Sequence, residues 1–288
     1  MERIYNYMKN DEYRHKLNDL TEKTFGFSFE DWVKNGYFEG DYIPYSYLEE
    51  GKIICNVSAN RMDFLQNGSV KHYIQIGTVM TDESYRRRGL AEKLLRYVVE
   101  QYEGKCDGIY LFGDLSALGF YKKAGFGQLK EYRYLLRDGA VSCAAVSGFV
   151  PVQETQRMQY LEMVRHGAVY SALEQTNKFG LQLFYTASME NVYYHPLLDC
   201  FVVLEKEGNT LILQSVICKE KLPLQTIIAQ LGNDYDRLML GFAPLKEEQT
   251  LFIAEVYDGG EDYRLFYRGE QLECIEKEKL YFPQLSHA

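Results

Sequence analysis

The sequence predicts an α/β fold built from two successive units, and three observations support this. Apolar residues make up 46% of the 288-residue chain, with 25 Tyr and 16 Phe, which is enough to form a sizeable core. Between residues 70 and 137, β-rich runs alternate with amphipathic helical segments. A similar order of elements recurs after residue 154. Because a chain of this length exceeds what one core usually organises, we expect two domains.

The first elements are helical and are followed by a long hairpin. Residues 10–37 have a helical pattern, in which "SFEDW" opens a second helix with Ser28 as its cap and Asp31 three positions later. The β-rich runs "KIICNVSANRMDFL" and "KHYIQIGTVMT" come next and are joined through "QNGS". Asn67-Gly68 predicts a tight turn because both residues tolerate a positive φ. We therefore expect an antiparallel pair of long strands.

A helix, a strand, a helix and a strand complete the first unit. "GLAEKLLRYVVEQY" has apolar residues at helical spacing, so one face should pack on the sheet. "GIYLF" predicts a short buried strand, "SALGFYKKAG" a short helix ending at Gly125, and "QLKEYRYLL" another strand. The small-residue segment 137–153 has no periodicity, which is typical of a domain boundary. The predicted domains are residues 1–137 and 154–288.

The second unit repeats this order in a degenerate form. "ETQRMQYLEMVRHGAVYSALEQ" is helical, and "CFVVLEKEGNTLILQSVIC" predicts a strand pair that turns at Gly208-Asn209. "LPLQTIIAQL" predicts a helix and "DRLMLGF" a strand. The turn before that helix, "KEKLPLQ", has no glycine-containing basic loop, so no phosphate site is expected there.

Charge and cysteine usage exclude several classes of function. The net charge of −9 argues against non-specific binding to nucleic acid or to anionic membranes, because both are rich in phosphate. The six cysteines are scattered and form no CxxC pair, so we expect neither a metal site nor a disulfide framework. The start of the chain lacks an apolar signal core, and no 18-residue apolar run occurs. We expect a cytoplasmic protein.

A basic loop precedes the long helix of the first unit, within "YRRRGLAEKLL", residues 85–95. The first N–H groups of a helix are unpaired, and the macrodipole places positive charge behind them, so such a loop suits a phosphate. The glycine lets the backbone approach a ligand, and arginines add charge-assisted hydrogen bonds. A solvated basic turn is the alternative. The residues are Arg86, Arg87, Arg88, Gly89, Leu90 and Ala91.

Two motifs in the first unit resemble those of the GNAT superfamily of N-acetyltransferases. Arg-x-x-Gly-x-Ala is similar to the Gln/Arg-x-x-Gly-x-Gly/Ala signature of that family. "DLSALGFYKKAGF", residues 114–126, is similar to Asn-x-x-Ala-x-x-Phe-Tyr-x-x-x-Gly-Phe, with Ala117, Phe120, Tyr121, Gly125 and Phe126 in register. "YIQIGTVMTDESYRRRGLA" resembles the family's fourth strand running into the loop. The resemblance implies a GNAT fold, a mixed, mostly antiparallel sheet flanked by helices, followed by a second, degenerate GNAT-like domain.

The resemblance also implies acetyl-CoA as cosubstrate. The backbone around Val79, Met80 and Thr81 would hold the acetyl carbonyl, Gly77 would suit a bulge that separates two strands, and the basic loop would bind the pyrophosphate. Tyr121 would protonate the leaving sulfur, because a phenol of pKa ~10 faces a thiol near ~8.5. The remaining cofactor contacts implied are Asp114, Ala117 and Phe120. Asp114 stands where the family usually has Asn, and an ionised Asp cannot donate the amide hydrogen bond.

Neither the general base nor the acceptor is assigned by the sequence. Gln75 stands where some relatives have Glu, so His72, Glu30 or a chain of waters remain as alternatives. The segment 31–50 is rich in aromatic and acidic residues, and it predicts either a cation-binding mouth or an aromatic surface under a loop. Its members are Trp32, Tyr37, Tyr42, Tyr45, Tyr47, Glu39, Asp41, Glu49 and Glu50.

These patterns favour an acetyl-CoA-dependent N-acetyltransferase that acts on the primary amine of a small molecule by direct attack on the thioester. The alternative is a GNAT-fold protein that binds CoA as a sensor or scaffold without turnover. The second domain would complete the acceptor cleft or form a homodimer surface. This arrangement also resembles the enhanced-intracellular-survival aminoglycoside acetyltransferases, whose third, sterol-carrier-like domain has no counterpart in residues 1–288. In those enzymes a C-terminal carboxylate is the base, and whether Ala288 reaches the site is left open.

Overall fold

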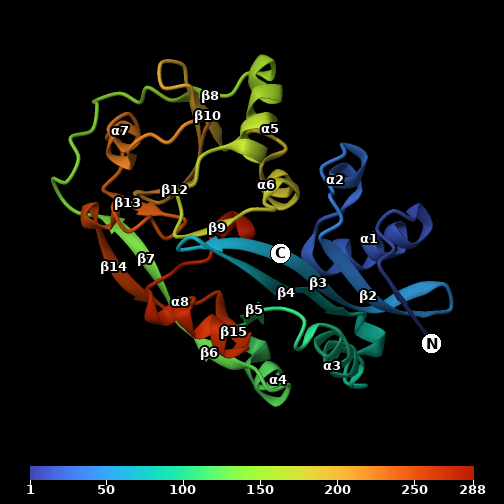
Figure 1. Ribbon diagram of the computed structural model, residues 1–288. Helices are drawn as coiled ribbons and strands as arrows, with labels where there is room; N and C mark the ends of the chain where they lie inside the picture. The colour runs from blue at the N-terminus through green and yellow to red at the C-terminus, as the bar shows by residue number, and fades with distance from the viewer.

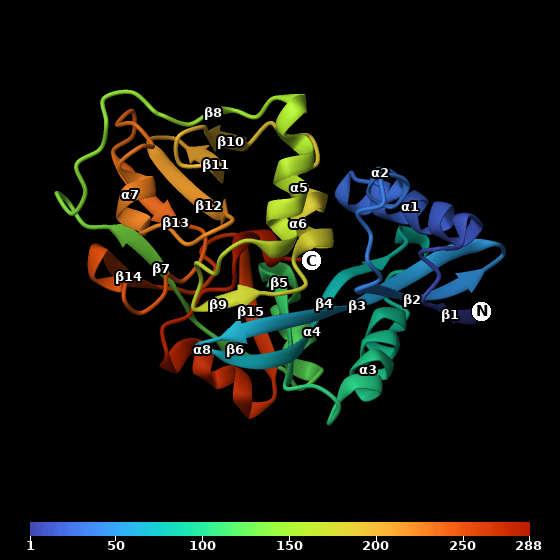
Figure 2. The same cartoon turned by 45° about the horizontal axis from the view of Figure 1, so that its top comes forward.

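The computed structural model describes residues 1–288, which form two β-sheets flanked by helices (Figures 1 and 2). The first sheet has the strand order β1-β2-β3-β4-β5-β15-β6, with β9 paired to the end of β3, and the second has the order β14-β7-β13-β12-β11-β10-β8. Most neighbouring strands are antiparallel, while β4 and β5, and β12 and β13, are parallel. The predicted mixed, mostly antiparallel α/β architecture is confirmed.

The first part of the chain follows the predicted order of elements, with two strands, β1 and β2, that were not predicted. The 288-residue chain begins with β1(Glu2–Tyr5), α1(Asp11–Phe25), α2(Glu30–Lys34), β2(Tyr42–Glu49), β3(Lys52–Gln66), β4(Ser69–Thr81), α3(Leu90–Tyr102), β5(Gly108–Asp114), α4(Leu118–Lys123) and β6(Gly127–Leu129). The predicted hairpin is confirmed: Gln66 pairs with Ser69, and Asn67 and Gly68 adopt φ values of 45° and 84°. The Ser28 hydroxyl accepts a hydrogen bond from the Glu30 N–H at the start of α2, 3.3 Å away.

The second part of the chain contains more strands than the sequence patterns predicted. Its elements are β7(Glu131–Leu136), β8(Val150–Pro151), α5(Arg157–His166), β9(Leu173–Gln175), α6(Phe179–Thr186), β10(Val192–His195), β11(Cys200–Glu207), β12(Thr210–Cys218), α7(Leu224–Ile228), β13(Arg237–Leu240), β14(Phe252–Tyr257), β15(Tyr263–Arg268) and α8(Cys274–Lys277). The turn predicted at Gly208-Asn209 joins β11 to β12, where Glu207 pairs with Thr210.

The two sheets exchange strands. β15, near the end of the chain, inserts between β5 and β6, so that Leu265 pairs with Phe112 on one side and Leu129 on the other. β7 pairs with β13 and β14 in the second sheet. The prediction of "QLKEYRYLL" as one strand of the first unit is wrong, because the chain passes from one sheet to the other at Lys130. The domain limits 1–137 and 154–288 stay a prediction, and strand pairing crosses them in both directions.

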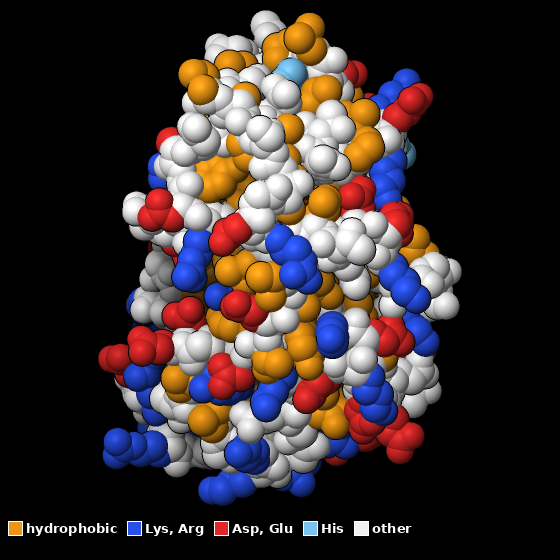
Figure 3. All heavy atoms as spheres, turned by 90° about the vertical axis from the view of Figure 1, so that its left-hand side faces the viewer, with side chains coloured by type: hydrophobic (Ala, Val, Ile, Leu, Met, Phe, Trp, Pro, Cys, Tyr) orange, Lys and Arg blue, Asp and Glu red, His pale blue; other side chains and the backbone are white.

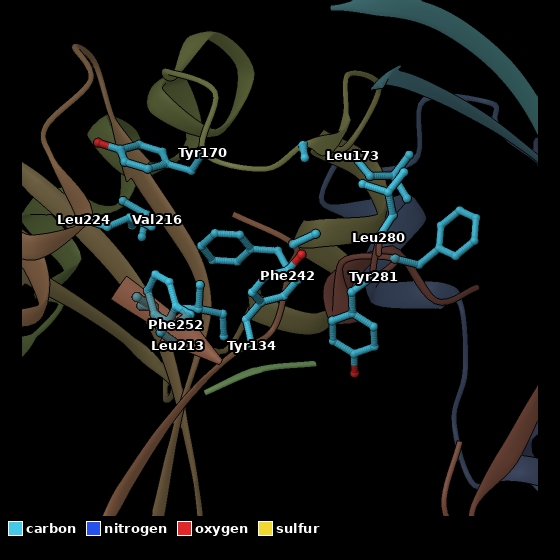
Figure 4. Packing of buried hydrophobic residues seen from close by; sticks show 14 of the residues in the cluster. Tyr134, Tyr170, Leu173, Leu213, Val216, Leu224, Phe242, Phe252, Leu280 and Tyr281 are labelled. Carbon is cyan, nitrogen blue, oxygen red and sulfur yellow. The ribbon is translucent and has the colours of Figure 1, made fainter. Parts of the chain in front are cut away.

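The main hydrophobic core lies between the sheets and includes residues from both halves of the chain. Figure 4 shows part of it, with Tyr134 of β7, Leu213 and Val216 of β12, and Leu280 and Tyr281 of the last segment. Phe282 stacks on Tyr110 of β5 with ring centroids 4.2 Å apart. The final residues of the chain therefore connect both sheets, and the halves are not independently packed bodies.

The surface shows no large area of one charge on the face drawn in Figure 3. Lys and Arg side chains alternate there with Asp and Glu, separated by small apolar areas. No helix has the length and apolar character needed to cross a bilayer. No group of three or more His, Cys, Asp or Glu side chains lies in an arrangement that could hold a metal ion.

A buried carboxyl at the start of β7 predicts pH-dependent stability. Glu131 Oε1 accepts a hydrogen bond from the Phe282 N–H at 2.9 Å, while Oε2 has no partner. Burial raises the pKa of Glu131 to about 8, so the folded protein retains a proton that the unfolded chain loses near pH 4.5. The free energy of unfolding should therefore decrease as the pH rises from 4.5 to 8, by up to ~1.4 kcal/mol per pH unit.

Glu131→Gln should remove this pH dependence, because the amide keeps the acceptor for Phe282 and carries no titratable proton. Urea unfolding at pH 5 and pH 8, compared between the two proteins, measures the effect. We expect the variant to be the more stable protein at pH 8 by about 2–4 kcal/mol. If both proteins lost the same amount of stability between pH 5 and pH 8, Glu131 would not be the source of the pH dependence.

Candidate active site

Strands β4 and β5 separate at the centre of the first sheet. They pair in parallel at Tyr73–Gln75 with Gly108–Tyr110, and no pairing continues beyond Gln75. A bulge in β4 follows at once: Ser58 of β3 pairs with Gly77, and Asn56 pairs with Met80. The predicted bulge is therefore present, and it directs the backbone of β4 away from β5.

Hydrogen bonds from β2 and β3 hold this bulge in shape. Thr78 adopts a φ of 39°, which costs energy for a β-branched residue. The Asn56 amide donates to the Thr78 carbonyl at 2.9 Å, and the Thr78 hydroxyl lies 2.8 Å from the Tyr42 hydroxyl and 2.9 Å from that of Ser58. The strained backbone is thus fixed by polar groups on the neighbouring strands.

A cavity of about 630 Å³ opens at the separation of the two strands. Most of the predicted site residues line it, and it extends from α3 and α4 across the sheet to α1, α2 and α6. The predicted residues in its wall are Val79, Met80, Thr81, Arg86, Ala91, Asp114, Ala117, Phe120 and Tyr121. Arg87, Arg88 and Gly89, which belong to the loop before α3, and Leu90, the first residue of α3, are not in the wall.

The basic loop leaves the start of α3 open. Gly89 has a φ of 71°, and no side chain caps the first N–H groups of this 13-residue helix. Nothing lies within 4 Å of a Cβ built on Gly89, so the positive φ, and not lack of space, requires glycine there. Arg86 Nε donates to the Thr81 carbonyl at 3.3 Å, and Arg88 Nη2 donates to the Ser84 carbonyl at 2.8 Å. Open amides beside arginines suit an anion.

Tyr121 is buried in the wall of the cavity, on α4. Its ring packs against Phe120 and Phe266, with centroids 5.0 and 5.2 Å away, and Phe266 belongs to the inserted strand β15. A Cβ on Gly113 would lie 2.7 Å from Tyr121 Cε2, so β5 needs glycine to let the ring lie against it. Burial, with a smaller effect of Asp114, raises the pKa of Tyr121 to about 12. The phenol is therefore protonated and able to donate at neutral pH.

Asp114 has a local structural role. Its Oδ1 accepts a hydrogen bond from the Ser116 N–H at 2.7 Å, which caps the turn before α4 and lowers the pKa of the carboxyl. The acidic residue at this position of the motif is thus explained by the cap, which an ionised Asp forms well.

The two side chains considered as bases do not reach the cavity. His72 is exposed, and its Nδ1 lies 2.7 Å from Asp63, whose carboxylate raises the pKa of the ring. Glu30 binds Arg14 at 2.8 Å, which lowers the pKa of Glu30 to about 2. Neither side chain lines the cavity, and Gln75 is buried.

The aromatic and acidic segment 31–50 divides between two places. Trp32, Glu39, Asp41 and Tyr42 line the cavity, where the predicted cation-binding mouth would need them. The other members lie elsewhere. Tyr45 and Tyr47 pack in the core under α3, Tyr37 packs in the core beside α5 and α6, and Glu49 and Glu50 lie at the hairpin between β2 and β3.

The cavity has a wall from the second half of the chain that the sequence did not reveal. Gly180, Leu181, Phe184 and Tyr185 of α6 face it. These residues belong to no motif of the sequence analysis. Their helical pattern alone does not show which part of the molecule α6 packs against.

The last residues of the chain also lie at the site. A Cβ on Gly77 would stand 2.5 Å from the carbonyl oxygen of Ala288 and 2.9 Å from Asn60 Nδ2, so the tail occupies the space beside the bulge. His287 stacks on Phe112 at 3.7 Å, and the Tyr185 hydroxyl donates to its carbonyl at 2.5 Å. Burial lowers the pKa of His287 to about 3, so the ring is neutral. Ala288 therefore does reach the cavity.

Comparison with known proteins agrees with this geometry. The acetyltransferase (GNAT) family model matches residues 2–126. Residues 2–126 therefore match a GNAT domain. The match includes the separated strands, the loop before α3 and Tyr121. No curated protein matches the chain by sequence.

Solved structures extend the likeness to almost the whole chain. A probable N-acyltransferase from Enterococcus faecalis has 12% identity and a TM-score of 0.57 over 95% of this chain and 74% of its own. A GCN5-related N-acetyltransferase from Kribbella flavida has 16% identity and a TM-score of 0.56 over 94% and 72%. Eis1 from Mycobacterium abscessus has 12% identity and a TM-score of 0.56 over 95% and 75%. These likenesses show the fold, including the second, GNAT-like half that was predicted.

Proposed function

We propose that this protein transfers an acetyl group from acetyl-CoA to the primary amine of a small molecule, by direct attack of the amine on the thioester. The main support is one observation: the wall of a single cavity includes the bulge of β4, Arg86 of the basic loop before α3, and Tyr121. A thioester acyl transfer needs an anion site, donors for the developing oxyanion and a donor for the leaving sulfur. The basic loop before α3, the backbone of the β4 bulge and Tyr121 are groups of these three kinds.

The residues present fit coenzyme A. The open N–H groups at Leu90 and Ala91 would bind the pyrophosphate, with Arg86 adding charge from the cavity wall. The backbone of β4 at Val79 and Met80 would orient the acetyl carbonyl, as the family resemblance implies. Bound acetyl-CoA supplies the activated acetyl group.

Tyr121 would stabilise the leaving group. A CoA thiol ionises near pH ~8.5, so complete proton transfer from a phenol with a pKa of about 12 is unfavourable. The main contribution of Tyr121 is then a hydrogen bond to the sulfur as negative charge develops on it. The attacking amine reacts in its neutral form, so the rate should rise with pH while the amine loses its proton.

Binding of CoA without turnover is the second candidate function. The observation in its favour is that neither His72 nor Glu30 lies in the cavity, and that Asp114 replaces the Asn of the family motif. Such a sensor would bind acetyl-CoA with the same residues and release no thiol when amines are added.

Binding and turnover are tested separately. Calorimetry should detect acetyl-CoA binding, and acetyl-CoA at 100 times its Kd should stabilise the protein by about 2.7 kcal/mol. Arg86→Ala should weaken this binding about tenfold, while Arg237→Ala, at an exposed position of β13, should leave it unchanged. Free-thiol release in the presence of an amine then distinguishes an enzyme from a sensor. Absence of acetyl-CoA binding would refute both candidate functions.

A further inference from the structure

We propose that the acceptor is an amine with a single positive charge and an aromatic, or similarly large apolar, body that binds against an aromatic wall of the cavity. This inference rests on the proposed function and names its substrate class. The aromatic wall is defined as Phe27, Phe29, Trp32 and Phe184, all of which line the cavity.

The aromatic wall is built by both halves of the chain. Phe184 of α6 lies 5.3 Å from Phe27 and 5.7 Å from Trp32, ring centroid to ring centroid, in edge-to-face contacts. Phe27 and Phe29 are 5.1 Å apart in the same kind of contact. Edge-to-face packing leaves ring faces available to a further aromatic group.

A polar contact and a glycine keep α6 against α2. Trp32 Nε1 donates to the Gly180 carbonyl at 2.6 Å, which orients the indole. A Cβ on Gly180 would lie 3.0 Å from the Tyr37 carbonyl oxygen and 3.5 Å from Trp32 Cζ2, so only glycine allows this approach without a shift. The aromatic wall is therefore a preformed surface, which lowers the cost of ordering it on binding.

Apolar surface at the cavity remains open to solvent. Phe25, which also lines the cavity, is 50% exposed, and Phe27, Trp32 and Phe184 are only partly buried. Water against such a surface is displaced favourably by an apolar ligand, in proportion to the area covered. The lining thus favours a ligand with a ring or a branched alkyl group.

The acidic side chains at this end of the cavity carry no surplus negative charge. Asp41 pairs with Arg61 at 3.3 Å, and Glu39 pairs with Arg165. The Arg165 guanidinium also lies 3.4 Å from the centre of the Phe179 ring, which holds it in place. At this end of the cavity, a ligand with several ammonium groups would have to bury charges without counter-ions, which is costly. The pairing therefore disfavours polyamines and other polycations, although the net charge of the whole chain is −9.

Three acceptors separate the contributions of the ring and of charge. Phenethylamine and ethylamine carry one ammonium each and differ by the ring, while spermidine is a polycation without a ring. With acetyl-CoA and free-thiol detection, kcat/KM for phenethylamine should exceed that for ethylamine about 30-fold, as expected for burial of a phenyl group. Spermidine should be no better than ethylamine. Equal kcat/KM values for phenethylamine and ethylamine, or a preference for spermidine, would overturn the inference.

The wall can also be tested without turnover, because Trp32 is the single tryptophan of the chain. Phenethylamine should change tryptophan fluorescence in a saturable manner, and spermidine should not. This readout separates the two proposals. Saturable phenethylamine binding without thiol release would refute the proposed function while supporting the wall as the amine site, and thiol release with ethylamine or spermidine alone would refute only the inference.

A pair of variants at Phe184 assigns the effect to the wall. Phe184→Ala should raise KM for phenethylamine about tenfold and leave both KM for ethylamine and the Kd of acetyl-CoA unchanged. Phe184→Leu preserves apolar bulk and serves as the fold-preserving variant, with an expected change of about threefold or less. If both variants keep the wild-type KM for phenethylamine, the ligand does not lie on the wall.

Discussion

Tyr121→Phe should lower kcat about 100-fold while the Kd of acetyl-CoA changes by less than about twofold. The substitution removes the hydroxyl and keeps the ring contacts with Phe120 and Phe266. Because the hydroxyl would act on the leaving sulfur only as charge develops, its loss should affect the chemical step more than binding. Steady-state thiol release with phenethylamine and calorimetry with acetyl-CoA measure the two quantities.

Tyr97→Phe is the matched control for this variant. Tyr97 of α3 is half-buried against Tyr45, outside the cavity, so kcat should not change. The pH profile gives an independent check: with a pKa of about 12, Tyr121 remains protonated up to pH 10, and wild-type activity should show no loss from its ionisation below that pH. An unchanged kcat in Tyr121→Phe would exclude the phenol from the reaction.

Residues 1–137 expressed alone should fail to fold. In this fragment β5 and β6 lose β15, which pairs with both, and β7 loses β13 and β14. Phe266, fully buried against Tyr121, and Phe282, stacked on Tyr110, are lost as well. The unpaired strand edges and exposed core should cause aggregation. Circular dichroism melting and size-exclusion chromatography should show no cooperative unfolding and no monomeric, acetyl-CoA-binding species.

The control is the full chain with a protease site placed in the segment 138–147, which contains no helix or strand. After cleavage the two pieces should elute together and keep the affinity for acetyl-CoA, because strands of each piece remain within the sheet of the other. A folded, acetyl-CoA-binding fragment 1–137 would show that the exchanged strands are not needed for the first sheet.

The sequence alone determined the features that depend on residues close together along the chain. The positive φ values of Asn67, Gly68 and Gly89 follow from the conformations those residue types allow, so the β3–β4 hairpin and the loop before α3 were predictable. The helical spacing after Gly89 and the order of small and aromatic residues around Tyr121 likewise indicated α3, α4 and a GNAT domain. Most of the predicted cofactor residues consequently line one cavity.

Only the tertiary structure decided which distant segments complete the site. The sequence patterns did not predict β15, and its partners β5 and β6 lie more than a hundred residues earlier in the chain. The periodicity of α6 likewise does not reveal that Phe184 meets Trp32, and nothing in "QLSHA" places Ala288 beside Gly77. These contacts depend on the packing of the whole chain, since non-local pairing is chosen by the total burial it achieves and not by any local preference.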